Sequence, residues 1–166
     1  MMKKYVKYIK RAKALGARHA KVIAAKSIIA AEWVRMKCQF GCDGYGGCLT
    51  CPPNSPTPER TRRMLGEYKY AILVHGDEYT DIRKLVSALE REIFLDGCYK
   101  AFGMGAGPCE LCDGCAEVCR HADKARPSLE ACGIDVFGTV RANGFPIQVV
   151  RAHGCKENYY GIVLVE

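Results

Sequence analysis

The sequence has no apolar run long enough to cross a bilayer: its longest runs, such as YAILV and GIVLV, are far shorter than a membrane span. It also lacks the apolar core of a signal peptide, because charged side chains recur every few positions in the opening MMKKYVKYIKRAK. These absences argue against a membrane span and a secretion signal. We therefore expect a cytoplasmic protein, in a reducing compartment where clustered cysteines are more often metal ligands than disulfides.

Familiar nucleotide and hydrolase motifs are also missing. The stretch GMGAGP invites a dinucleotide-binding fingerprint, but Pro108 and Glu110 stand where its last glycine is required. No His-Glu-x-x-His motif occurs, and no Ser–His–Asp set can be picked out. The sequence therefore predicts neither a dinucleotide site of this type nor a protease of these classes.

Acidic residues are absent from residues 1–31, which hold nine of the 25 Lys and Arg residues. The rest of the chain is nearly neutral, so the formal net charge of +7 belongs to this segment. Apolar residues at helical spacing predict a basic amphipathic helix over residues 1–16, ending at Gly16. Its basic face is either solvated or binds an anionic partner: an acidic protein, a nucleic acid or a membrane surface. Without an aromatic platform or a helix-turn-helix pattern, we expect no nucleic-acid partner.

Length and composition fit a single domain over residues 1–166, since a chain with 49% hydrophobic residues can bury a core without staples. The predicted helices cover residues 2–15, 57–68, 78–95 and 128–140, and the predicted strands cover residues 20–29, 70–75, 98–107, 145–150 and 159–165. Because helices and strands alternate, we expect an α/β or α+β fold with a single small mixed sheet, helical cover and two cysteine-rich metal-binding loops.

Eleven cysteines are the most unusual feature of the composition. The stretch GPCELCDGCAEVCRH predicts a cysteine loop over residues 109–121 with the spacing Cys-x2-Cys-x2-Cys-x3-Cys. Its thiols belong to Cys109, Cys112, Cys115 and Cys119. Thiolates this close repel one another unless a cation compensates them, and the spacing is typical of bacterial ferredoxins, which bind iron–sulfur clusters. Zinc is the alternative metal, although paired Cys-x2-Cys zinc sites are spaced differently.

A second cysteine loop is predicted over residues 38–53, where CQFGCDGYGGCLTCPP is too rich in Gly and Pro for a regular element. Its thiols belong to Cys38, Cys42, Cys48 and Cys51. Eight clustered thiols suffice for two four-iron (4Fe-4S) clusters with four cysteines each. The two loops follow different strands, so they can meet at one edge of the sheet. Cys98, Cys132 and Cys155 fit small buried residues better than ligands, with Cys132 the most plausible exception.

The division of ligands between two clusters is open. In two-cluster ferredoxins the fourth cysteine of the run serves the other cluster and precedes a proline, whereas Cys119 precedes Arg120. If Cys119 joins the first loop, Cys48 or Cys132 completes the other cluster. His121 could replace a thiolate, but a histidine outside the ligand set is the commoner arrangement.

Four segments together resemble a known family, the predicted metal-binding proteins grouped as domain of unknown function 2284. The segments are KCQFGCDGYG, CPPNSPTPE, GPCELCDGC and CRHADKARPSLEACGIDV, and the resemblance covers most of the chain beyond the N-terminal helix. It implies an iron–sulfur or other metal site. The cysteines that match the family's pattern are Cys38, Cys42, Cys51, Cys109, Cys112, Cys115 and Cys119. Cys48 lies outside that pattern, Cys132 lies in its EACGID segment, and Ala122 replaces the usual proline after Arg-His.

These observations predict an iron–sulfur protein, with two four-iron clusters, that transfers electrons at low potential to or from a redox partner protein. Acidic residues beside the thiols disfavour adding an electron, which favours a low potential. These acids are Asp43, Glu110, Asp113 and Glu117. One alternative is an enzyme in which a cluster with three cysteine ligands leaves one iron open to a small substrate. The other is a zinc-stabilised interaction module without a redox role.

Overall fold

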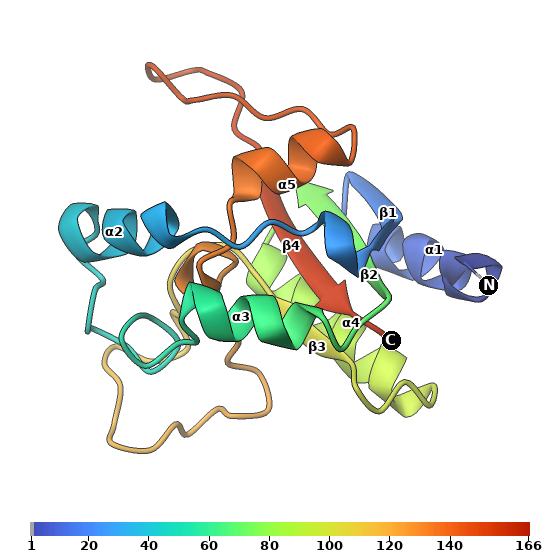
Figure 1. Cartoon of the computed structure of the whole chain (residues 1–166), viewed down its shortest axis with the longest axis horizontal. Coiled ribbons are helices and arrows are strands. Elements are labelled where there is room, and N and C mark those ends of the chain that lie inside the picture. The colour runs from blue at the N-terminus through green and yellow to red at the C-terminus, as the bar shows by residue number, and fades with distance from the viewer. Residues whose placement is uncertain (1) are drawn as a thin grey trace.

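The computed structural model describes residues 2–166 and contains one four-stranded sheet with helices packed on both faces (Figure 1). The strands are β1 (His19–Ala24), β2 (Tyr70–Gly76), β3 (Phe102–Met104) and β4 (Tyr159–Leu164), in the spatial order β1-β2-β4-β3. The α-helices are α1 (Val6–Ala14), α2 (Glu32–Gly41), α3 (Pro58–Leu65), α4 (Ile82–Leu95) and α5 (Val136–Ala142). Three short 3-10 helices are η1 (Met2–Tyr5), η2 (Ala25–Ser27) and η3 (Glu130–Cys132).

The strands pair in an antiparallel manner throughout: β1 with β2, β2 with β4, and β3 with β4. The fold is therefore α+β, one of the two predicted classes, and the prediction of one small sheet with helical cover is confirmed. The sheet differs from the expectation in not being mixed. Pair direction depends on how the connections cross the sheet, which local sequence patterns do not encode.

The core has two layers because β2 and β4 are buried on both faces. Ile72 and Val74 face α1 and α4, while the alternate residues Ala71 and Leu73 face the layer that contains α3, η3 and α5. Helix α4 lies very close to the sheet: a Cβ built on Gly161 of β4 would lie 2.6 Å from a methyl carbon of Val86. The side chains of α3, η3 and α5 instead leave room at one end of the sheet, beside α2.

Local signals account for several helix boundaries. The Thr57 side chain accepts a hydrogen bond from the Arg60 N–H and precedes Pro58, so α3 begins where the sequence predicts. The Asp81 carboxylate accepts the Lys84 N–H, which starts α4 at Ile82 rather than at residue 78.

Other predicted boundaries are wrong. Residues 145–150 form no strand, the segment 128–140 divides into η3 and α5, and β1 ends at Ala24. Helix α2 continues to Gly41, so Cys38 lies in a helix rather than in a loop. No helix within residues 2–166 has the length and apolar character of a membrane-spanning segment.

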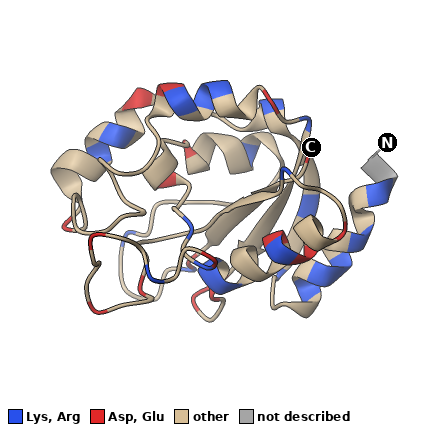
Figure 2. Ribbon diagram, turned by 90° about the horizontal axis from the view of Figure 1, so that it is seen from below, with Lys and Arg blue, Asp and Glu red and all other residues tan. Residues whose placement is uncertain are grey.

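The basic helix α1 is packed against the rest of the chain rather than standing free. Tyr8 and Ala12 of α1 are buried, as is Tyr5 of the preceding η1. Cations of these two elements pair with acids of the same chain: Lys4 of η1 with Glu166, and Lys7 and Arg11 of α1 with Asp96 and Glu92. Figure 2 shows the Lys and Arg residues along this helix. Part of the predicted positive face is therefore neutralised within the protein.

Candidate metal centre

The first cysteine loop begins on α2 and ends before α3. Cys38 lies in the last turns of α2, with its Sγ 3.8 Å from the Glu130 carbonyl oxygen, and Cys42 follows directly after the helix. Tight turns hold the two later cysteines: the Cys51 N–H donates to the Cys48 carbonyl at 3.1 Å, and the Asn54 N–H donates to the Cys51 carbonyl at 2.9 Å. The loop is therefore a compact backbone unit with four thiols.

Cys48 and Cys51 form the closest thiol contact, with 3.1 Å between their sulfurs. Burial raises the pKa of Cys51 to about 12. Burial would raise the pKa of Cys48 as well, but hydrogen bonds from Thr50, from the Cys51 thiol and from the Cys109 N–H lower it overall. Of the two thiols, Cys48 therefore loses its proton more readily. The two sulfurs would have to separate to bind different irons of one cluster.

The second cysteine loop runs from the end of β3 to η3 and contains neither a helix nor a strand. Its base is closed by backbone hydrogen bonds, from the Gly105 N–H to the Pro127 carbonyl and from the Leu129 N–H to the Gly105 carbonyl, both 2.9 Å. Arg83 of α4 also pairs with Glu110 at 2.7 Å and donates to the Pro108 carbonyl. These contacts fix both ends of the loop on the sheet and α4.

The four thiols of the second loop line one small cavity of about 20 Å³. They belong to Cys109, Cys112, Cys115 and Cys119. Leu49 and Thr50 of the first loop complete its wall, together with Arg120 and His121. Because both loops line this cavity and the Cys109 N–H donates to the Cys48 sulfur, the two loops lie side by side. They lie at the same end of the sheet (Figure 1).

The thiols are grouped, but they are not arranged around a single point. Within residues 2–166 no three His, Cys, Asp or Glu side chains converge as the ligands of one metal ion would. A four-iron cluster places its cysteines on four separate irons, and therefore spaces the sulfurs more widely than one ion does. The donor chemistry, thiols from two neighbouring loops, fits such a cluster.

The remaining cysteines occupy other places. Cys132 is fully buried in the core between the sheet and α3, and burial raises the pKa of its thiol to about 12. Cys98 packs against the layer that contains α1 and α4, and Cys155 is half-buried in the segment before β4. Cys132 follows Ala131, whose carbonyl accepts hydrogen bonds from Arg35 of α2 and from Ser55 after the first loop.

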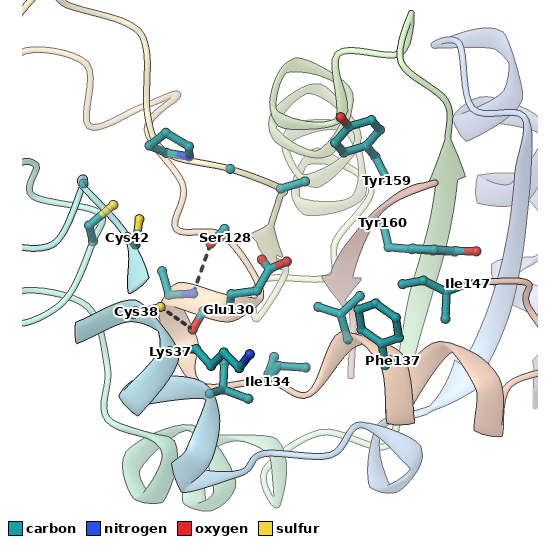
Figure 3. Close-up of a pocket in the computed structure, with 18 of the residues that line it drawn as sticks. Lys37, Cys38, Cys42, Ser128, Glu130, Ile134, Phe137, Ile147, Tyr159 and Tyr160 are labelled. Carbon is teal, nitrogen blue, oxygen red and sulfur yellow. Dashed lines mark hydrogen bonds between the residues drawn. The ribbon is translucent and has the colours of Figure 1, made fainter. Parts of the chain in front are cut away.

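A much larger cavity, of about 560 Å³, adjoins the first loop. Cys38, Cys42 and Cys51 line one end of it, whereas Cys48 does not. Figure 3 shows Cys38 and Cys42 at one side, Tyr159 and Tyr160 at the other, and the Glu130 carboxylate directed into the space between them. Burial of the Glu130 carboxyl group raises its pKa, while the residue as a whole is exposed toward the cavity. Sequence reasoning missed this cavity and Glu130, because its walls come from segments far apart in the chain.

Comparison with known proteins agrees with the site. Residues 21–165 match the family described as predicted metal-binding protein (DUF2284), and the chain belongs to this family. The resemblance inferred from the cysteine segments is thereby confirmed. A metal-binding protein is therefore the class that the family and the grouped thiols define. No curated protein and no solved structure matches the chain.

Proposed function

We propose that the chain is a cytoplasmic iron–sulfur protein with two four-iron clusters, which transfers electrons at low potential to or from a protein partner. The observation that carries this proposal is that all four thiols of the second loop line one small space, directly beside the first loop. At about 20 Å³ this space has room for about one water molecule, so the loop would have to open to hold a cluster. When bound, a four-iron cluster supplies reversible one-electron transfer. Because all four thiols of the second loop line this cavity, we group Cys119 with the other three cysteines of its own loop rather than with the first loop.

The chain's own residues would hold and tune such clusters. The loop base and Arg83 fix the second loop, while the Cys109 N–H is directed at the sulfur of Cys48. Hydrogen bonds to sulfur and nearby charges set the potential of a cluster. Glu110 is paired with Arg83, so its negative charge is offset, and the low potential then depends on Asp43, Asp113 and Glu117.

The first loop also supports a second candidate function, an enzyme with one iron open to a small substrate. Three of its thiols, those of Cys38, Cys42 and Cys51, line the large cavity, and Cys48 does not. The same three match the family's cysteine pattern, whereas Cys48 lies outside it. An electron carrier has no need of such a space next to its ligands. A cluster held by Cys38, Cys42 and Cys51 would present its remaining iron where a small molecule can reach it.

Metal analysis of protein purified without oxygen tests the proposal. We expect about eight iron and eight sulfide per chain, since each of two clusters contains four of each. Cys112→Ser and Cys42→Ser should each lose about half of the iron, because each substitution removes a ligand of one cluster. Cys98→Ser, on the opposite face of the sheet, should keep all of it. Stoichiometric zinc without sulfide would refute the proposal and favour the zinc-stabilised module.

A spectral titration separates the carrier from the enzyme. Adding cyanide or a small thiolate should leave the visible spectrum unchanged if cysteines ligate every iron, and should change it if one iron is open. Cys48→Ala adds a second readout. It should leave the iron content intact if the first loop holds a three-thiolate cluster, and lower it if Cys48 is the fourth ligand.

A further inference from the structure

The large cavity beside the first loop has the size and lining of a small-molecule site. Its volume of about 560 Å³ lies within the range of about 300–1,000 Å³ typical of pockets for small organic ligands. Its walls come from α2, η3, the start of α5, the segment before β4, and β4 itself. Most of the lining side chains are apolar or aromatic, so the few charged groups decide which ligand fits.

Glu130 is the charged group at the centre of this cavity (Figure 3). The η3 backbone that follows Glu130 is fixed by two hydrogen bonds: the Ser55 hydroxyl donates to the Ala131 carbonyl at 2.6 Å, and the Thr61 hydroxyl donates to the Cys132 carbonyl at 2.6 Å. In the described part of the chain, no ion pair includes the Glu130 carboxylate. The carboxylate is exposed toward the cavity, so it can pair with a cation that enters there.

The remaining charges of the cavity also favour a cation. Glu157 is a second carboxylate in the lining and accepts a hydrogen bond from the Tyr159 hydroxyl, while Lys37 is the one lining residue with a positive charge within residues 2–166. Aromatic side chains of three separate elements line the same space: Trp33, Phe137 and Tyr159. Aromatic faces attract organic cations, and such rings around a carboxylate form a common ammonium-binding arrangement.

We infer that this cavity binds a small organic cation, an ammonium group on an apolar body, with the ammonium on Glu130 and the body against the aromatic wall. The inference goes beyond the proposed function, because the recognition uses side chains of the chain itself and does not require a cluster. It assigns a class of ligand, organic ammonium ions, to the cavity that Cys38, Cys42 and Cys51 line.

Phenethylamine is a suitable probe, with 2-phenylethanol as its neutral and 3-phenylpropionate as its anionic counterpart. Each is titrated into the full chain, purified without oxygen, and binding is followed by calorimetry. Fluorescence of Trp33, the only tryptophan in the sequence, reports whether binding occurs at the cavity. We expect the amine to bind at least about tenfold more tightly than the alcohol and to change the Trp33 emission, and the anion to bind least.

Two variants and one control locate the cation. Glu130→Gln should weaken amine binding at least about tenfold and leave alcohol binding nearly unchanged, because only the charged partner is lost. Tyr159→Leu should weaken the amine more than the alcohol, since it removes an aromatic face without touching η3. Glu67→Gln, at an exposed glutamate outside the cavity, should have no effect.

The opposite results overturn the inference. Equal or tighter binding of the anion, a Glu130→Gln variant that binds the amine normally, or no binding of the amine at all would each refute it. Iron and sulfide measured on the same preparation keep the two proposals apart. A protein with both clusters and no amine binding refutes this inference alone, whereas amine binding without iron refutes only the iron–sulfur proposal.

Discussion

Removing the Glu90 carboxylate should loosen the base of the second cysteine loop. This carboxylate accepts from Nε and Nη2 of Arg126 at 2.6 Å each, and from the Gly103 N–H at 2.8 Å. The two side chains are only 17% and 11% exposed, and Arg126 lies at the end of the loop. The pair therefore joins the loop, β3 and α4 at one point.

The loss of folding free energy in Glu90→Gln comes from the Arg126 charge, which stays largely buried without its partner. Removing one partner of a buried ion pair costs about 3–5 kcal/mol, because the other charge stays buried without compensation. Arg126 keeps the Ala122 and Ala125 carbonyls as acceptors for Nη1, at 3.0 and 2.8 Å, so we expect the lower end of this range. For a chain of this size, about 3 kcal/mol lowers Tm by about 6–12 °C.

Urea unfolding followed by circular dichroism measures this loss, and iron analysis of the same samples shows whether the loop still holds metal. Glu92→Gln is the matched control on the same helix, since its pair with Arg11 is 35–48% exposed and should contribute less than about 1 kcal/mol. The double variant Glu90→Gln with Arg126→Met should be less destabilised than the sum of the single variants. A loss below about 1 kcal/mol for Glu90→Gln, or additive single variants, would refute the reasoning.

Other predictions concern pH and the N-terminal helix. Burial lowers the pKa of His75 below its usual 6.5, so its neutral form contributes stability that is present above pH 6.5 and lost as the pH falls through the folded-state pKa. Titration of the His75 ring by NMR should show this lowered pKa, and His75→Gln should flatten the acid limb of the stability curve. Burial raises the pKa of Cys132 from 9.0 to about 12, so stability should fall as the pH rises from about 9 to 12, and Cys132→Ala should reduce that slope. Reversing the charges of the exposed Lys10 and Lys13 should change the free energy of unfolding by less than about 0.5 kcal/mol. Tyr5→Ala should instead cost about 3–5 kcal/mol if η1 and α1 serve to pack against the core. The opposite order of these two effects in urea unfolding would contradict a packing role.

Elements whose signals are local could be predicted from the sequence. The helix α4 has five apolar positions on one face, and α3 has its cap and proline in the expected order, so both are found by periodicity and turn chemistry. Residues 145–150 are mostly apolar, as a buried strand is, but no strand of the described chain pairs with them, and residues 147–150 line the cavity instead. A strand needs a partner that local sequence cannot name.

The candidate site also has parts that local sequence predicts and parts that it does not. The cysteine spacing within each loop is local, and it predicts the candidate ligands. The contact between Cys48 and the Cys109 N–H, and the position of Glu130 in a cavity with Trp33 and Tyr159, join segments far apart in the chain. Nothing in the residues around Glu130 distinguishes it from a surface glutamate before the chain is folded.

The central position of β4 has a consequence for how the protein is made. β4 contains residues 159–164, yet it lies between β2 and β3, so β3 has no neighbour until these residues arrive. A ribosome that adds about 5–20 residues per second needs on the order of several seconds to pass from β3 to β4. The first cysteine loop is complete before that interval and the second is synthesised within it, while the edges of β2 and β3 that β4 later covers stay open to other chains. The sheet beside the second cysteine loop is therefore complete only after residues 159–164 have been added.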